Sequence, residues 1–126
     1  MAVTTEIAPN IYRISIFAQR NNLQFNHFLV KDDEPLLFHT GLRGMHAEIR
    51  EAVSKLINLS ELRHISFSHF ESDDCGSLNE WLAAAPKTDV ICSQVGALVE
   101  RERLIGRESR ALTDGGTFAT GKYRFR

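Results

Sequence analysis

The chain has 126 residues, a length that one domain with its own core accounts for. Its composition, 43% hydrophobic and 25% charged, is typical of a globular protein, and a formal net charge of −1 argues against a binder of nucleic acid or of anionic membrane. No apolar run approaches the roughly 18 residues of a membrane span, and the first residues lack the pattern of a signal peptide. The two cysteines form no disulfide framework, so we expect a cytoplasmic protein.

Three strands are predicted in the first part of the chain. Residues 11–17 and 25–30 are rich in β-branched and aromatic side chains, and residues 36–39 form another apolar run. The turn at residues 32–35 predicts that these strands form an antiparallel meander. An amphipathic helix over residues 45–57 follows, because its apolar residues fall at helical spacing: Met45, Ile49, Val53, Leu56 and Ile57.

Strands and helices then alternate. Residues 63–67 predict a short strand in which His64 faces solvent, and residues 89–92 predict another. Ser77 and Glu80 match a capping box, which predicts a helix with Trp81 in its buried stripe. Ser93 is expected to cap a further helix that carries Val95, Leu98, Val99 and Glu102. Glycines divide the tail at residues 117–125 into hairpin-like segments. The order predicts an α/β fold, a mixed sheet covered by helices.

A dense set of metal-capable side chains follows the strand at residues 63–67. His69, Glu71, Asp73 and Asp74 offer one imidazole and three carboxylates, and alternate side chains of a loop that leaves a strand can face one pocket. This donor set suits iron, manganese or zinc better than it suits metals that prefer thiolates. Because the acidic groups repel one another, they favour either a bound cation or open solvent.

Other interpretations of this loop remain open. The loop can be a solvated acidic turn, since aspartates are favourable at the start of a helix through capping and the helix dipole. Asp74 fits that interpretation better than it fits a ligand. His39 ends the strand at residues 36–39 and is a weaker candidate for the same pocket. Cys92, at the end of an apolar strand, is expected in the core.

The meander, the strand–helix alternation and the loop together resemble the metallo-β-lactamase fold. The string His69-Phe70-Glu71-Ser72-Asp73-Asp74 resembles the His-x-Glu-x-Asp-His motif of the flavodiiron branch, the oxygen and nitric oxide reductases, whereas the wider superfamily carries His-x-His-x-Asp-His. The resemblance implies that His69 and Glu71 contact a first metal and Asp73 a second. Asp74 stands where the family has its second histidine, and relatives often carry Asp at the position of His39. A carboxylate at Asp74 can still ligate iron or manganese.

The resemblance also implies half of an αββα sandwich. The family's domain continues with a further histidine, a bridging aspartate and a last histidine, which this sequence does not show. We therefore expect residues 1–126 to form a single half-domain that is not catalytic alone, and whether it is an enzyme stays open. Half a sandwich exposes a sheet edge and an apolar face, which predicts a homodimer that covers the missing half.

Three functions follow from these observations. The first is a metal-binding module for oxygen or nitric oxide, holding iron (two ions in a complete site), with zinc or manganese as alternatives. The second is a metal-free interaction or oligomerisation module. The third is a metal-dependent hydrolase that activates water, which Glu71 disfavours because hydrolytic members carry histidine in that slot.

Overall fold

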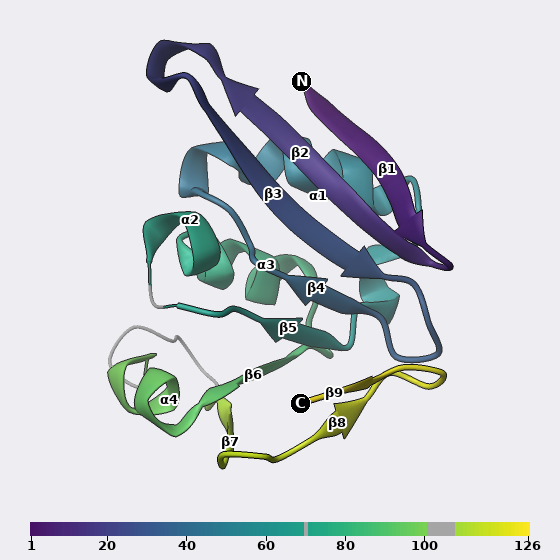
Figure 1. Cartoon of the computed structure of the whole chain (residues 1–126), viewed down its shortest axis with the longest axis vertical. Helices are drawn as coiled ribbons and strands as arrows, with labels where there is room; N and C mark the ends of the chain where they lie inside the picture. Colours follow the sequence, from purple (N-terminus) through teal and green to yellow (C-terminus); the bar gives the residue numbers. More distant parts are fainter. Residues whose placement is uncertain (70, 101–107) are drawn as a thin grey trace.

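A single seven-stranded sheet forms the frame of the molecule (Figure 1). The computed structural model describes residues 1–69, 71–100 and 108–126. The strands lie side by side in their sequence order. The first four pair antiparallel: β1 (Ala2–Ala8), β2 (Ile11–Ala18), β3 (Leu23–Val30) and β4 (Leu36–Phe38). The next three join as parallel neighbours: β5 (His64–Ser66), β6 (Asp89–Ser93) and β7 (Arg110–Leu112). The predicted meander and mixed sheet are confirmed.

Helices connect the parallel strands, and α1 and α3 lie behind one face of the sheet (Figure 1). The α-helices are α1 (His46–Ser54), α2 (Ser72–Cys75), α3 (Leu78–Ala84) and α4 (Gln94–Glu100). Three 3₁₀ turns are η1 (Gln19–Asn21), η2 (Arg43–Met45) and η3 (Leu59–Glu61). A separate antiparallel pair, β8 (Phe118–Ala119) and β9 (Arg124–Phe125), forms the predicted hairpin near the carboxyl end. Within the described residues, no helix has the length and apolarity needed to span a bilayer.

The hydrophobic core lies between the sheet and these helices. Alternate strand residues face it, as the period of two in a strand requires. Its fully buried members include Ile14, Leu29, Leu37, Ile65 and Val90 from the sheet and Ile49, Val53 and Trp81 from the helices. Cys92 is also buried in this cluster, as predicted.

Two predicted helix boundaries change in the structure. Helix α1 covers His46–Ser54 instead of residues 45–57. Met45 belongs to the turn η2, and after Ser54 the helix gives way to a turn in which the Leu56 N–H donates to the Val53 carbonyl. Ile57 still packs in the core, with its N–H on the Val53 carbonyl at 3.0 Å. The predicted Ser93 cap is confirmed, since the Gly96 N–H donates to its Oγ at 3.0 Å. Glu102, predicted on the same helix, lies outside the described residues.

Two other sequence predictions are wrong, and burial explains both. His64 does not face solvent but is 4% exposed, because β5 has a neighbour on each side and the Phe118 ring lies 5.7 Å from the imidazole. Ser77 does precede α3, but its side chain makes no capping hydrogen bond. It is fully buried and donates to the Thr40 carbonyl at 2.8 Å, while Glu80 pairs with Arg43.

Candidate metal centre

The loop that carries the predicted metal ligands leaves the carboxyl end of β5. Since β4 and β5 are parallel, with Phe38 opposite Ser66, the residues that follow both strands meet at one edge of the sheet. The first residue after β4 is His39, and its N–H donates to the Ser66 carbonyl at 2.9 Å. The topology therefore brings a residue from the meander next to the acidic loop.

Short backbone hydrogen bonds hold residues 39–41 against the loop. The Thr40 N–H donates to the Asp74 carbonyl at 2.7 Å, and the Ser77 N–H donates to the Gly41 carbonyl at 3.0 Å. The Thr40 carbonyl also accepts from Ser77 Oγ and, at 3.4 Å, from the Trp81 indole N–H. Because Thr40, Ser77 and Trp81 are all fully buried, the start of α2 has a fixed position relative to the sheet.

Three of the four predicted ligands lie together. Glu71, Asp73 and Asp74 each place one carboxylate oxygen within 4.8 Å of the other two. Glu71 is exposed, Asp73 is half-buried and Asp74 is 8% exposed, so the cluster runs from the surface into the protein. Among the described residues this is the one cluster of three or more metal-capable side chains with such spacing.

The fourth predicted ligand, His69, lies at the rim of the cluster. Its side chain is 73% exposed, and its Nδ1 is 4.0 Å from Asp74 Oδ2. The same Nδ1 lies 3.0 Å from Ser68 Oγ. His69 therefore contacts only the buried end of the cluster and has the freedom of a surface side chain.

His39 also lies at the buried end of the same cluster. Its Nδ1 is 3.4 Å from Asp74 Oδ1, and its side chain is 19% exposed. Its Nε2 lies 2.9 Å from Ser68 Oγ and accepts the Ser68 N–H at 3.3 Å. Since Nε2 accepts a backbone N–H, the proton of the neutral ring lies on Nδ1, toward Asp74. Sequence reasoning ranked His39 low, although its place at a strand end parallel to β5 was the signal that could have found it.

His27 is buried and lies next to Gly41. The His27 Nδ1–H donates to the Ile14 carbonyl at 3.0 Å, whereas Nε2 has no hydrogen-bond partner among the described residues. Burial lowers the pKa of His27; the hydrogen bond to Ile14 opposes this shift, and the nearby charge of His39 adds to it. A Cβ added to Gly41 would lie 2.8 Å from His27 Nε2, so the chain can pass here only as glycine.

The chemistry of the donors fits a divalent transition-metal ion. Carboxylate oxygens with imidazole nitrogens are the usual ligands of iron, manganese and zinc, whereas a thiolate would be needed to favour softer metals. Three clustered carboxylates also gain from a cation, because their mutual repulsion is then offset. Glu71, Asp73 and Asp74 would hold the ion, with the imidazoles of His39 and His69 near Asp74.

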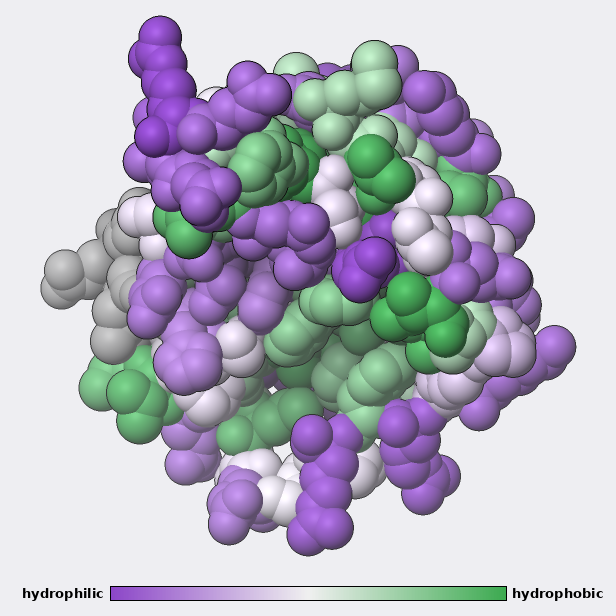
Figure 2. Space-filling model, turned by 45° about the horizontal axis from the view of Figure 1, so that its top comes forward, coloured by the Kyte–Doolittle hydropathy of each residue, from purple (hydrophilic) through white to green (hydrophobic). Residues whose placement is uncertain are grey.

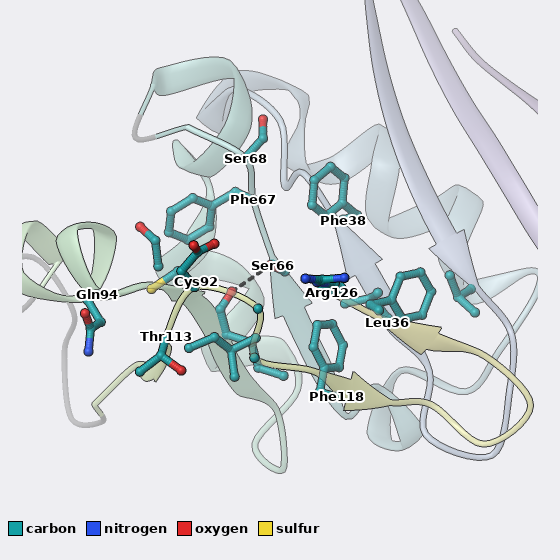
Figure 3. A pocket seen from close by; sticks show the side chains of 18 of the residues that line it. Leu36, Phe38, Ser66, Phe67, Ser68, Cys92, Gln94, Thr113, Phe118 and Arg126 are labelled. Atoms are coloured by element: carbon teal, nitrogen blue, oxygen red, sulfur yellow. Dashed lines mark hydrogen bonds between the residues drawn. The ribbon is translucent and has the colours of Figure 1, made fainter.

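A cavity of about 850 Å³ lies on the sheet face opposite α1 and α3 and reaches Ser68 beside the loop. Figure 2 shows apolar surface gathered in a hollow that hydrophilic residues border. Figure 3 shows Phe38, Phe67 and Phe118 around this space, with Arg126 between Phe38 and Phe118. The strands supply its floor through Phe28, Val30, Leu36, Ser66 and Ile91. The β8–β9 hairpin therefore covers only part of this sheet face, which is called the open face below.

Comparison with known proteins places this fold and loop in a family. Residues 23–114 match the family model described as ODP family beta lactamase. The diflavin flavoprotein A 2 of Synechocystis sp. is 28% identical over 108 residues, which are 84% of this chain and 18% of that protein. The diflavin flavoprotein A 1 of Thermosynechococcus vestitus is 32% identical over 79 residues, 63% of this chain and 14% of that one. An anaerobic nitric oxide reductase flavorubredoxin homolog of Escherichia coli O157:H7 is 26% identical over 69 residues, 55% of this chain and 17% of that protein.

Solved structures show the same fold. Rubredoxin oxygen:oxidoreductase from Desulfovibrio gigas superposes with a TM-score of 0.81 at 19% identity, covering 97% of this chain and 34% of that one. The flavodiiron protein from Giardia intestinalis gives a TM-score of 0.83 at 15% identity, covering 98% and 33%. The chain thus spans less than a fifth of these curated relatives and about a third of these solved chains. By its matched residues and its fold, this chain belongs to the ODP family of β-lactamase-fold proteins, the family that the flavodiiron resemblance predicted.

Proposed function

We propose that this chain is a flavodiiron-like metal-binding module whose loop after β5 holds iron and binds oxygen or nitric oxide. The observation that carries the proposal is the convergence of Glu71, Asp73 and Asp74 within 4.8 Å at the end of a parallel strand. Similar proteins include an anaerobic nitric oxide reductase flavorubredoxin homolog and a rubredoxin oxygen:oxidoreductase, which supports these two gases as ligands. Zinc and manganese suit the same donors and are the alternative metals.

Each part of the loop has a distinct role in this proposal. Glu71, Asp73 and Asp74 hold the metal, and His69 is a further ligand at the exposed rim. Thr40 and Ser77 fix the position of Asp74 through buried hydrogen bonds. The bound metal supplies an electron-rich centre to which a diatomic gas can attach. Catalytic turnover by this chain alone is not part of the proposal, since a two-metal centre needs more ligands than this cluster offers.

We also propose that two copies associate through the open face of the sheet. The cavity over β4–β6 leaves aromatic and aliphatic side chains partly uncovered, and β1 is an edge strand with Val3 and Ile7 59% and 50% exposed. A sheet edge and an apolar face are both surfaces that proteins normally cover. Cys75 and Cys92 are both buried and form no disulfide in the described structure, in keeping with a reducing cytoplasm as the setting.

A second candidate is a metal-free interaction module that uses the same open face. The apolar cavity favours it, because that surface would serve a partner whether or not the loop binds metal. The two candidates differ in one measurable property, the metal content of the protein. A hydrolase is less well supported, since Glu71 holds the slot that carries histidine in the hydrolytic members.

Metal content tests the proposal directly. Untagged protein purified without chelator is analysed by plasma mass spectrometry, together with Glu71→Ala and with Glu61→Ala, an exposed carboxylate outside the loop, as the matched control. We expect one or two irons per chain in the native protein and in Glu61→Ala, and a large loss in Glu71→Ala. Less than about a tenth of an ion per chain in the native protein would favour the metal-free module.

A further inference from the structure

We infer that His39 is a ligand of this metal centre, bound through Nδ1 beside Asp74. The inference deepens the proposed function and rests on it. In the described structure, both imidazoles lie near one carboxylate, with His39 next to Oδ1 and His69 next to Oδ2. His39 is the less exposed of the two histidines, 19% against 73%, so its ring has the more defined position.

The separation of the atoms suits a shared ion. His39 Nδ1 and Asp74 Oδ1 are 3.4 Å apart, longer than a good hydrogen bond. Two donor atoms that each lie about 2.1 Å from one divalent ion are commonly separated by such a distance. The imidazole and the carboxylate can therefore bind the same ion with little movement of either side chain.

The other ring nitrogen has the partner that a metal-bound histidine needs. A ligating histidine usually donates its second N–H to an oxygen, which fixes the ring and its tautomer. Nε2 of His39 lies 2.9 Å from Ser68 Oγ, which can accept such a proton. Without metal, Nε2 accepts the Ser68 N–H and the ring proton is on Nδ1. Metal binding at Nδ1 would need the ring proton on Nε2, which would then donate to Ser68 Oγ and give up the Ser68 N–H.

The backbone and the neighbouring ring also hold His39 in place. Its φ is +67°, a left-handed conformation that is unfavourable for non-glycine residues and that clusters at functional sites. The Phe38 ring stacks on the imidazole with a centroid distance of 4.3 Å. This places an imidazole beside Asp74, which stands where the family resemblance expects a histidine, and the imidazole comes from the residue that follows β4.

The test compares cobalt binding by the native protein, by His39→Asn and by His46→Asn. Asparagine tolerates a positive φ better than most residues, and it can keep a hydrogen bond to Asp74. His46 lies on α1, where its ring contacts Trp81 of α3, and is the matched control outside the loop. We expect His39→Asn to weaken Co²⁺ affinity by about tenfold or more, as loss of a ligand or its support does, and His46→Asn to leave it unchanged. Circular dichroism shows whether both variants fold.

Nitrogen-15 NMR of the native protein provides a readout that does not depend on any variant. With Zn²⁺ added, the His39 Nδ1 signal is expected to move to a metal-bound position while Nε2 becomes protonated. Unchanged cobalt affinity in folded His39→Asn would overturn this inference alone. So would weaker affinity with no metal shift at His39 Nδ1, since His39 would then only position Asp74. Native protein that binds neither Co²⁺ nor Fe²⁺ would overturn the proposed function together with the inference.

Discussion

Thr120 donates a hydrogen bond to Asp32, and this bond ties the carboxyl-terminal hairpin to the meander. Thr120 Oγ1 lies 2.9 Å from Asp32 Oδ2, although the two residues are 88 positions apart. The same oxygen accepts the N–H groups of Lys122 and Tyr123 at 2.8 and 3.2 Å. The Glu34 N–H also donates to the Thr120 carbonyl at 2.7 Å, so several hydrogen bonds hold the hairpin that partly covers the open sheet face.

Asp32 should make the stability of the protein depend on acid pH. Desolvation is the largest single influence and raises the pKa of Asp32, but the hydrogen bonds from Asp33, Thr120, Tyr123 and Lys122 together outweigh it, and the net pKa is lowered. A lowered folded-state pKa contributes stability that is present above the unfolded pKa of about 4 and is lost as pH falls through the folded value. Thermal unfolding scans between pH 7 and pH 3 should show this loss. In Asp32→Asn the loss should be smaller and the unfolding temperature at pH 7 lower.

Replacement of Gly41 by alanine should destabilise the fold. Gly41 has a φ of +85°, and an added Cβ would lie 2.5 Å from Ile49 Cδ1 as well as close to His27. Backbone strain and overpacking together should cost about 2 kcal/mol or more. Gly44→Ala is the matched control, because no atom lies within 4 Å of its added Cβ. Urea unfolding of both variants gives the comparison, and equal stabilities would contradict the packing described here.

His64 should lower stability when the pH falls below neutrality. Burial lowers its pKa; Glu34 opposes that shift, and Arg63 adds to it. Because the unfolded chain then binds more protons than the folded one, stability falls as pH drops below the unfolded value of about 6.5. Neither ring nitrogen has a hydrogen-bond partner in the described structure, so His64→Leu should keep or raise stability at pH 7.5. It should also flatten the dependence on pH between 7.5 and 5.5. A pH profile identical to that of the native protein would rule out this role.

Self-association should depend on the open sheet face. Leu112 lines the cavity from β7, and a glutamate there would place a charge on the apolar surface. We expect Leu112→Glu to be a monomer by light scattering at concentrations where the native protein is a dimer. Leu98→Glu changes a 65% exposed side chain on α4 outside the cavity and should leave the dimer intact. A native protein that is monomeric at all concentrations would contradict the proposed association.

The sequence was most informative where a pattern is local. Alternation in β2 and β3 and the helical stripe of Ile49 and Val53 follow from neighbours in the chain, so their elements could be predicted. Strand β1 was not predicted, because an edge strand with mostly exposed residues needs no apolar alternation. Ser77 has a capping pattern, but its partner Thr40 lies 37 positions away.

In the candidate site, too, the sequence predicts what depends on neighbouring residues better than what depends on distant contacts. Glu71, Asp73 and Asp74 are close in the chain, so their clustering could be predicted. His39 was only a weaker candidate, because its place depends on parallel pairing of β4 with β5 and on contact with Ser68, 29 positions later. The exposure of His69 likewise depends on how the loop leaves the strand.

The order of the strands has a consequence for how the protein is made. Each strand of the main sheet pairs with the strand that precedes it in the chain, so no later strand has to insert between earlier ones. During synthesis the sheet can grow at a single edge, with each new strand added to one already in place. The bond of Thr120 to Asp32 is the exception, since it joins the end of the chain to a turn made early. Closing that long loop should be a late event in folding, after the sheet has formed.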